Sequence, residues 1–249
     1  MRIFSTLILL LALVSACAPA PTPPAELTVA AAADLQFAFG EIGALYEQQS
    51  GVKITFSFGS TGQLAQQIEN GAPFDLFAAA DRSYVDDLAA KNLIRPESVA
   101  LYARGRIVLA VNRQAGAQAI SLNDLLSDKI SRIAIANPEH APYGRAAMQA
   151  LKAAGVWEKI SAKLVYGENV RQTLQFVQSG DAQVGIVSLS VASVPEITWT
   201  LIDDSLHEPL DQALGILVSS AQPDQAARFA AFINGPQGRP IMQKYGFSQ

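Results

Sequence analysis

Small polar residues stand in this chain at turns between an apolar strand and a helix, where they could help to bind an anion. The first such stretch, Leu27–Gln49, combines a short apolar strand (Leu27–Ala31), a tight turn and an amphipathic helix. The helix is predicted by apolar residues that recur on one face, namely Leu35, Phe39, Ile42, Leu45 and Tyr46. Asp34 occupies the expected N-cap position. Because a helix N-terminus has free backbone N–H groups and a positive dipole end, this turn is a candidate anion site.

Three later stretches repeat the strand–turn–helix arrangement, at 52–70, 132–154 and 163–178. In the first of them Ser60 and Gln63 fit a capping box, and in the last Asn169 is a candidate cap. Capping alone explains small polar residues at such positions, so one turn is weak evidence for a ligand. Recurrence in both halves of the chain favours a binding site to which several turns contribute.

Catalytic signatures are absent from the sequence, which contains no GxSxG, HExxH, GxxxxGK[ST] or GxGxxG motif. The two histidines, His140 and His207, are far apart, and Glu139–His140 is the one pair that could act as acid and base. We interpret that pair as part of a turn that positions Pro142, and we expect no enzyme. A small hydrolase or transferase that uses Glu139 and His140 remains the alternative.

Composition and charge limit the possible partners. The chain has 249 residues, 50% of them apolar, which is enough for one large domain or two small lobes. The net charge is −4 and there is no basic tract, which argues against nucleic acid or an anionic membrane surface as a partner. A small anion is still compatible with this charge, because backbone N–H groups can bind one without Lys or Arg.

The N-terminal segment is typical of an exported protein. Residues 1–16 form a predicted signal peptide, with Arg2 as the charged start and Ile3–Leu13 as the apolar stretch. Val14–Cys17 resembles a lipobox, so we expect lipidation of Cys17, the single cysteine. Residues 17–26 are then the lipidated Cys and a Pro-rich tether. The alternative is an ordinary secretory signal that is cut a few residues further on.

The alternation of strands and helices predicts α/β lobes with mostly parallel sheets flanked by helices. The strand Arg106–Val111 is expected to cross to a second lobe, and the segment Thr198–Asp204 to cross back. Lobe I then consists of residues 27–104 plus 205–249, and lobe II of residues 105–204. Such a double crossover leaves a ligand cleft between the lobes, where helix N-termini can converge.

The chain resembles the molybdate-binding proteins of bacterial ABC importers, which belong to the two-lobe periplasmic binding proteins (type II). The resemblance covers almost all of Glu26–Phe247. The stretches that carry it are Ala31–Leu35, Phe58–Ile68, Gly71–Phe77, Pro138–Gly144, Glu168–Arg171, Gly185–Val187 and Lys244–Phe247. Several co-linear matches of this kind are a specific signal, and they imply the fold and the substrate class.

In that family, hydroxyl groups and backbone N–H groups hold a tetrahedral oxyanion between the lobes. The matching positions here are Asp34, Thr61, Tyr143, Val170 and Ser188. Thr61 keeps a hydroxyl where the family usually has Ser, and Val170 would act through its backbone N–H. Tyr143 replaces a small Ala and would donate through its backbone or supply a phenol. Ser188 replaces a Tyr, so its direct contact with the ligand is less certain.

Asp34 departs most from the family, which commonly has Ser at this position. An ionised carboxylate only accepts hydrogen bonds and would repel an anion. We favour the interpretation that Asp34 caps the helix and turns its carboxylate away. Two others stay open: Asp34 accepts a proton from a protonated ligand such as hydrogen phosphate, or it coordinates the central atom of the oxyanion directly.

The resemblance implies an extracytoplasmic solute-binding protein that captures molybdate, and tungstate as well, for the permease of an ABC importer. We expect a monomer with no cofactor and no metal other than the molybdenum or tungsten of the ligand. The expected location is the periplasm or the cell surface, with a membrane anchor at Cys17. The alternatives are a binding protein for another oxyanion, such as phosphate or sulfate, and a scaffold without a ligand.

Overall fold

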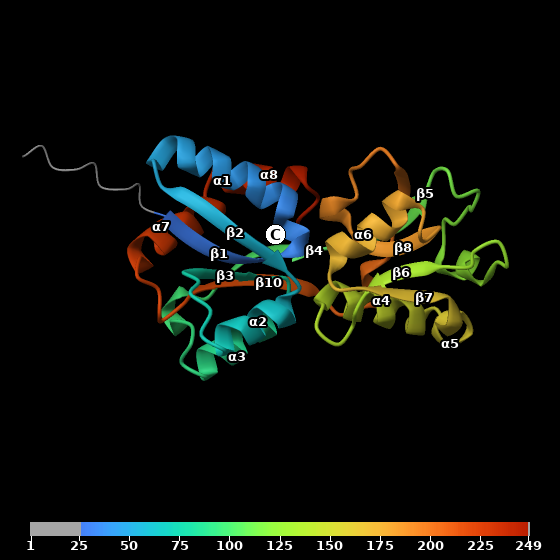
Figure 1. Cartoon of the computed structure of the whole chain (residues 1–249), viewed down its shortest axis with the longest axis horizontal. Coiled ribbons are helices and arrows are strands. Elements are labelled where there is room, and N and C mark those ends of the chain that lie inside the picture. The colour runs from blue at the N-terminus through green and yellow to red at the C-terminus, as the bar shows by residue number, and fades with distance from the viewer. Residues whose placement is uncertain (1–25, 249) are drawn as a thin grey trace, which may run out of the picture.

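The computed structural model describes residues 26–248 as two lobes placed end to end (Figure 1). Each lobe contains a five-stranded sheet with helices packed against it. This arrangement confirms the predicted two-lobe α/β fold. The predicted signal peptide, Cys17 and all of the tether except Glu26 lie outside the described residues.

The sheet of lobe I combines strands from both ends of the chain. Its order is β2 (Lys53–Gly59), β1 (Glu26–Ala32), β3 (Leu76–Ala79), β10 (Leu210–Ile216) and β4 (Ala100–Gly105). Four of these strands run in one direction, and β10 is inserted antiparallel between β3 and β4. The sheet is therefore mixed, because the strand that returns from lobe II enters it in the opposite direction.

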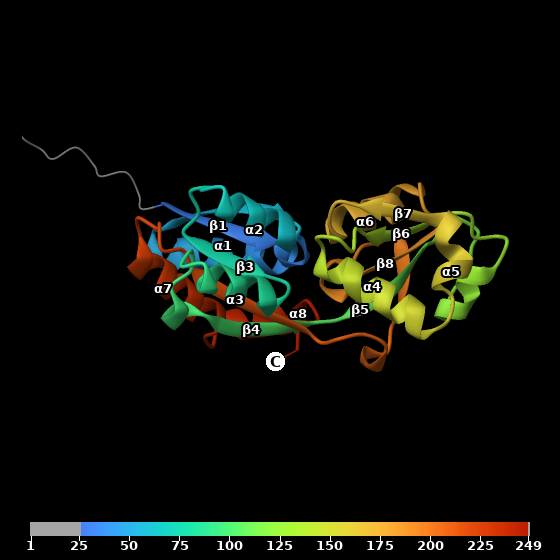
Figure 2. The same ribbon diagram turned by 90° about the horizontal axis from the view of Figure 1, so that it is seen from below.

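The sheet of lobe II has the same design. Its order is β7 (Leu164–Gly167), β6 (Ile133–Ala136), β8 (Val184–Ser188), β5 (Ile107–Asn112) and β9 (Ile197–Leu201). Here β5, which arrives from lobe I, is the antiparallel insertion between β8 and β9. Only Arg106 separates β4 from β5, and Figure 2 shows this strand passing from one lobe to the other.

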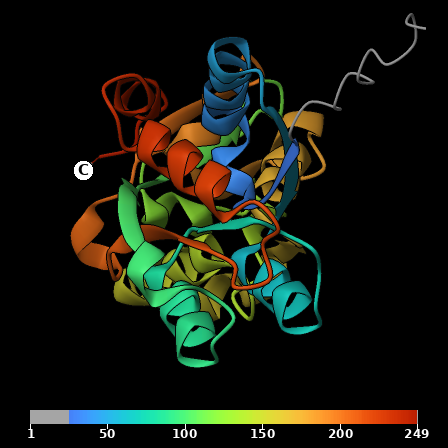
Figure 3. The same ribbon diagram turned by 90° about the vertical axis from the view of Figure 1, so that its left-hand side faces the viewer.

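Helices cover both faces of the lobe I sheet (Figure 3). One face packs against α1 (Gln36–Ser50) and α7 (Pro223–Ile233), where Phe39 and Phe229 are fully buried. The other face packs against α2 (Thr61–Glu69) and α3 (Arg82–Ala90) through Leu64 and Val85. The short α8 (Gly238–Lys244) lies beside α1. These apolar contacts fix the helix ends that point toward lobe II.

Lobe II contains α4 (Pro142–Ala153), the short α5 (Trp157–Ile160) and α6 (Val170–Ser179). Helix α2 begins at Thr61 and α4 at Pro142, so both include residues of the turns that precede them in the predicted strand–turn–helix stretches 52–70 and 132–154. Thr61 and Tyr143 therefore lie in the first turns of helices rather than in the preceding loops. Strand β4 was not predicted, because its sequence ALYARG shows no clear alternation.

Candidate functional site

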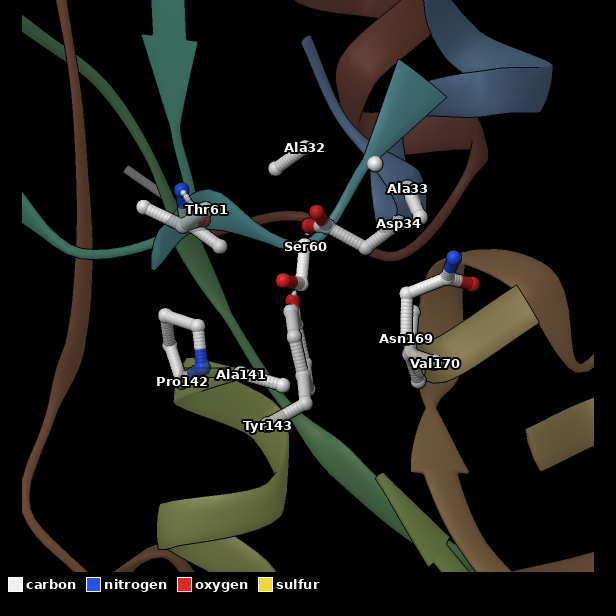
Figure 4. A pocket seen from close by; sticks show the side chains of 12 residues that line it. Ala32, Ala33, Asp34, Ser60, Thr61, Ala141, Pro142, Tyr143, Asn169 and Val170 are labelled. Atoms are coloured by element: carbon white, nitrogen blue, oxygen red, sulfur yellow. Dashed lines mark hydrogen bonds between the residues drawn. The ribbon is translucent and has the colours of Figure 1, made fainter. Parts of the chain in front are cut away.

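A small pocket lies between the two lobes, and helix N-termini from both lobes surround it (Figure 4). Lobe I contributes Ala32–Asp34, Gly59–Thr61 and Ala80; lobe II contributes Ala141–Tyr143, Asn169 and Val170. The empty volume is about 200 Å³, part of which is open to solvent. Among residues 26–248, those that line the pocket include no Lys, Arg or His. Such a site suits a small anion that is bound by neutral donors.

Residues in the first turns of four helices line this pocket. Thr61 and Val170 are the first residues of α2 and α6, Tyr143 is the second of α4, and Asp34 lies in the short 3-10 helix η1 (Ala33–Leu35). Helix geometry leaves N–H groups at such positions without an intrahelical acceptor, so they can bind an anion. The Asn169 side chain caps α6 as predicted, accepting from the N–H groups of Arg171 and Gln172.

Two hydroxyl groups lie at the start of α2. The Thr61 hydroxyl accepts a hydrogen bond from the Ala80 N–H at 3.0 Å, which leaves its own proton available for another acceptor. The Ser60 hydroxyl accepts from the Gln63 N–H at 3.4 Å and lies 2.8 Å from Nδ1 of His140. The predicted capping box is only half formed, because the Gln63 side chain donates to Glu168 instead.

Asp34 does not cap a helix, which corrects the interpretation favoured from the sequence. The N-cap of η1 is Ala32, and the buried Asp34 carboxylate makes no capping bond. Its Oδ2 atom accepts hydrogen bonds from Tyr143 Oη at 3.0 Å and from Gln212 Nε2 at 2.7 Å. Its Oδ1 atom is buried and has no hydrogen-bond partner among the described residues. Burial raises the pKa of Asp34 to about 6, although hydrogen bonds from Gln212, Tyr143 and the backbone N–H of Asp34 itself oppose this shift.

Asp34 is the end of a buried hydrogen-bonded chain that continues into the strands between the lobes. Gln212 Nε2 also contacts Tyr143 Oη at 3.0 Å, and Tyr102 Oη donates to Gln212 Oε1 at 2.8 Å. Burial raises the pKa of both tyrosines well above the usual value, so both phenols stay protonated. A side chain at Gly105 would disrupt these hydrogen bonds, because a Cβ atom there would lie 2.1 Å from Tyr143 Oη.

Ser188 lies behind the pocket rather than in its lining. Its hydroxyl is 2.5 Å from that of Ser190, and Ser190 Oγ donates to the Asp34 carbonyl at 2.8 Å. The Ser188 hydroxyl also lies beside the Tyr143 phenol, so its neighbours are side chains of lobe II. Of the five residues predicted to bind the ligand, the pocket lining therefore contains Asp34, Thr61, Tyr143 and Val170. Their contact with a ligand stays a prediction.

Contacts between the lobes surround the pocket. The N–H of Gly62 donates to the His140 carbonyl at 2.9 Å, and Arg171 Nε donates to Gln36 Oε1 at 2.9 Å. Farther out, Arg145 donates to Tyr84 Oη at 2.8 Å and pairs with Asp81. The His140 ring contacts Ser60 and lies 3.7 Å from Glu168, while Glu139 is exposed, so these contacts give no support to Glu139 as its partner. The lobes are thus closed on each other around the pocket.

Sequence reasoning missed three residues of the site: Tyr102, Ser190 and Gln212. Each is buried, and each contacts Asp34 directly or through one neighbour. The one available signal was the polar Gln212 beside an apolar strand segment, ALGIL. A buried amide of this kind needs hydrogen-bond partners, but sequence alone does not identify them.

The fold and the pocket define a class of protein: a two-lobe solute-binding protein that encloses a small ligand between its lobes. The family model described as bacterial extracellular solute-binding protein matches residues 27–248, and the chain belongs to that family. The members of this family bind solutes, so this chain is a binding protein and not an enzyme. Among the described residues, no helix is long and apolar enough to cross a membrane.

Known relatives cover nearly the whole chain. The molybdate-binding protein ModA of Rhodobacter capsulatus is 33% identical over 232 residues, which cover 91% of this chain and 90% of that protein. ModA of Azotobacter vinelandii is 34% identical over 228 residues, 90% of each protein. The solved structure of an Azotobacter vinelandii periplasmic molybdate-binding protein matches with a TM-score of 0.84 at 29% identity, covering 90% of this chain and 99% of that one.

Proposed function

We propose that this chain captures molybdate, and tungstate as well, outside the cytoplasm and delivers it to the permease of an ABC importer. The observation that carries the proposal is a small interlobe pocket in which helix N-termini from both lobes converge without a basic side chain. Neutral donors fixed at one separation select a tetrahedral oxyanion by its size. The molybdate-binding relatives at about one-third identity support the choice of ligand.

The binding test is isothermal titration calorimetry of the full chain with sodium molybdate, sodium tungstate, sulfate and phosphate. Charge-assisted hydrogen bonds contribute about 1.5–3 kcal/mol each, so several donors allow submicromolar binding. A ligand that binds only the folded state should also raise the melting temperature. Failure of millimolar molybdate and tungstate to bind or to shift the melting temperature would refute the substrate.

Val170→Pro tests the role of a helix N-terminus directly. Proline is tolerated at the first position of a helix but has no N–H group. Asn169 already has the extended backbone that a following proline needs, with φ −157° and ψ 174°. We expect molybdate affinity to fall by about 10- to 100-fold while α6 stays folded.

The matched control is Arg82→Pro, because Arg82 is the first residue of α3 and Asp81 before it is also extended. This control lies away from the pocket lining and should bind molybdate like the wild type. Equal affinities for the two proline variants would contradict the proposed role of the Val170 N–H group.

A second candidate ligand is hydrogen phosphate, which Asp34 specifically favours. An ionised Asp34 has a buried Oδ1 atom that could accept the proton of that ligand. Competition between phosphate and molybdate in the calorimeter distinguishes the two ligands.

We propose the remaining features on the sequence alone. These are a lipid anchor at Cys17, a monomeric state and lobe limits after residues 104 and 204. Mass spectrometry of the membrane fraction tests the anchor: a diacylglyceryl group on Cys17 is expected, whereas an unmodified N-terminus further along would show an ordinary secretory signal.

A further inference from the structure

The two oxygens of the Asp34 carboxylate have opposite surroundings. Oδ2 accepts two hydrogen bonds, from Tyr143 and Gln212, and Oδ1 accepts none among the described residues although it is buried. Figure 4 shows the carboxylate pointing into the pocket between Tyr143 and the start of α2. Buried polar atoms in proteins are normally hydrogen-bonded, and a ligand in this pocket would supply the partner of Oδ1.

Among residues 26–248, no basic side chain forms an ion pair or a hydrogen bond with Asp34. The groups that face Asp34 are Tyr143 from α4, Tyr102 and Gln212 from β4 and β10, and Ser190 from the 3-10 helix η5 (Leu189–Val191). Its own backbone N–H is a further, weaker donor to the carboxylate. On the pocket side stand neutral groups, which are Ser60, Thr61, Asn169 and Val170.

Two basic residues, Arg171 and His140, adjoin pocket-lining residues in the sequence. Arg171 Nε donates to Gln36, and its guanidinium lies 4.9 Å from the ring centre of Phe37, while its Nη1 atom is buried without a hydrogen-bond partner among the described residues. The His140 ring contacts Ser60 and lies 3.7 Å from Glu168. In the part of the chain that the structure describes, no Lys, Arg or His shifts the pKa of Asp34. An ionised Asp34 would therefore face a bound anion with its charge uncompensated, and the two would repel each other.

We propose that Asp34 is a specificity-determining residue that binds a fully ionised tetrahedral dianion only as a neutral carboxylic acid, whose Oδ1–H group donates a hydrogen bond to the ligand. This inference rests on the proposed function of the same pocket. The geometry fixes the position of the proton: Tyr143 and Gln212 hold Oδ2 as an acceptor, so the proton belongs on Oδ1. Neutral Asp34 then offers the ligand an O–H donor in place of a repelling charge.

Proton uptake on binding is the direct consequence. The raised pKa of about 6 means that free Asp34 is mostly ionised at neutral pH and must gain a proton when the dianion binds. The Kd for molybdate should rise as the pH passes about 6, and the rise should approach about tenfold for each pH unit well above this value. Hydrogen phosphate brings its own proton and can bind the ionised form, so its affinity should not fall in this way.

The experiment is calorimetry of the full chain with sodium molybdate at about pH 6, 7 and 8, in pairs of buffers with different ionisation enthalpies. Between about pH 6 and 8 we expect the Kd to rise about 50-fold, with nearly one proton taken up per molybdate at the higher pH. A Kd that stays constant over this range with no proton uptake overturns the inference.

Two variants of Asp34 sharpen the test. Asp34→Asn keeps an oxygen for Tyr143 and Gln212 and places an amide N–H where the carboxyl proton would be, so its Kd should not change with pH. Asp34→Ser provides a second neutral donor should the amide disturb folding, and it should behave in the same way. If the Kd of either variant still rises with pH as it does in the wild type, Asp34 is not the group whose protonation controls binding.

The control is Asp128→Asn, which removes an exposed carboxylate of lobe II. Its Kd for molybdate should rise with pH as in the wild type. Loss of this rise in the control would also count against Asp34. If molybdate fails to bind the wild type at every pH, the proposed function itself fails, an outcome distinct from tight binding without pH dependence.

Discussion

Asp34 connects the pocket to the closed arrangement of the lobes. Its carboxylate accepts from Tyr143 of lobe II, and its backbone carbonyl accepts from Ser190 of lobe II. Gln212, in a strand that returns from lobe II, holds the same carboxylate from the other side. One side chain therefore contacts the ligand pocket, the facing lobe and the crossing strands, so its protonation affects both binding and stability.

The stability of the ligand-free chain should depend on the titration of Asp34. Its pKa rises from 3.8 in the unfolded chain to about 6 in the folded one, so the folded state binds the proton more tightly. The resulting stabilisation is complete below about pH 4 and is lost as the pH rises through about 6. The difference amounts to about 3 kcal/mol at most.

Asp34→Asn lacks this titration, so it should gain free energy of unfolding relative to the wild type as the pH rises from about 4 to 8. Urea unfolding at several pH values measures the difference. If the free energy of unfolding changes with pH in the same way in both proteins, Asp34 does not titrate in this range.

At the scale of elements, the site depends on how closely α2 and the segment before α4 approach each other. The contact is made by the backbone: the Gly62 N–H donates to the His140 carbonyl at 2.9 Å. A Cβ atom at Gly62 would lie 2.7 Å from that carbonyl oxygen, which is too close for any side chain. Glycine is needed here because two backbones meet.

Gly62→Ala should weaken ligand binding without weakening lobe I. Alanine is a better helix residue than glycine by about 1 kcal/mol, so α2 itself should not suffer. The lobes, however, cannot close to the same distance, and we expect the molybdate affinity to fall at least about tenfold, as measured by calorimetry.

Gly40→Ala in α1 is the matched control, because a Cβ atom there meets nothing within 4 Å. It should bind molybdate normally and melt at an equal or higher temperature. Equal binding by both alanine variants would show that the contact at Gly62 does not limit closure.

At the scale of the whole molecule, closure depends on contacts far from the pocket as well as on the ligand. Arg145 of α4 bonds to Tyr84 and Asp81 of lobe I and lies over the Tyr84 ring, 5.3 Å from its centre. Such contacts favour the closed state, and a ligand that binds only this state gains affinity from its higher population.

Arg145→Ala should therefore lower molybdate affinity about three- to tenfold without altering any residue that lines the pocket. Small-angle X-ray scattering should show a larger radius of gyration for the ligand-free variant, which returns to the wild-type value with saturating molybdate. The control is Arg104→Ala, since Arg104 pairs with Asp211 inside lobe I at 2.7 Å. If both variants bind alike, the Arg145 contacts do not stabilise closure.

The sequence by itself determined the local units. The Asn169 cap and the strand–turn–helix order of 27–49, 52–70 and 163–178 follow from signals a few residues apart, and the structure confirms them. Family resemblance added the two-lobe fold, and four of the five predicted site residues do line one pocket.

Only the tertiary structure decided the environment of Asp34. The local pattern indicated a cap, but Gln212, 178 residues away, and Tyr143, 109 residues away, hold the carboxylate instead. The same holds for Ser188, whose hydroxyl contacts Ser190 behind the pocket, and for strand β4, which forms by pairing with β10. A cap depends on bonds between near neighbours and can be recognised in sequence, whereas burial and long-range hydrogen bonds arise when distant segments pack together, and they set the charge of the site.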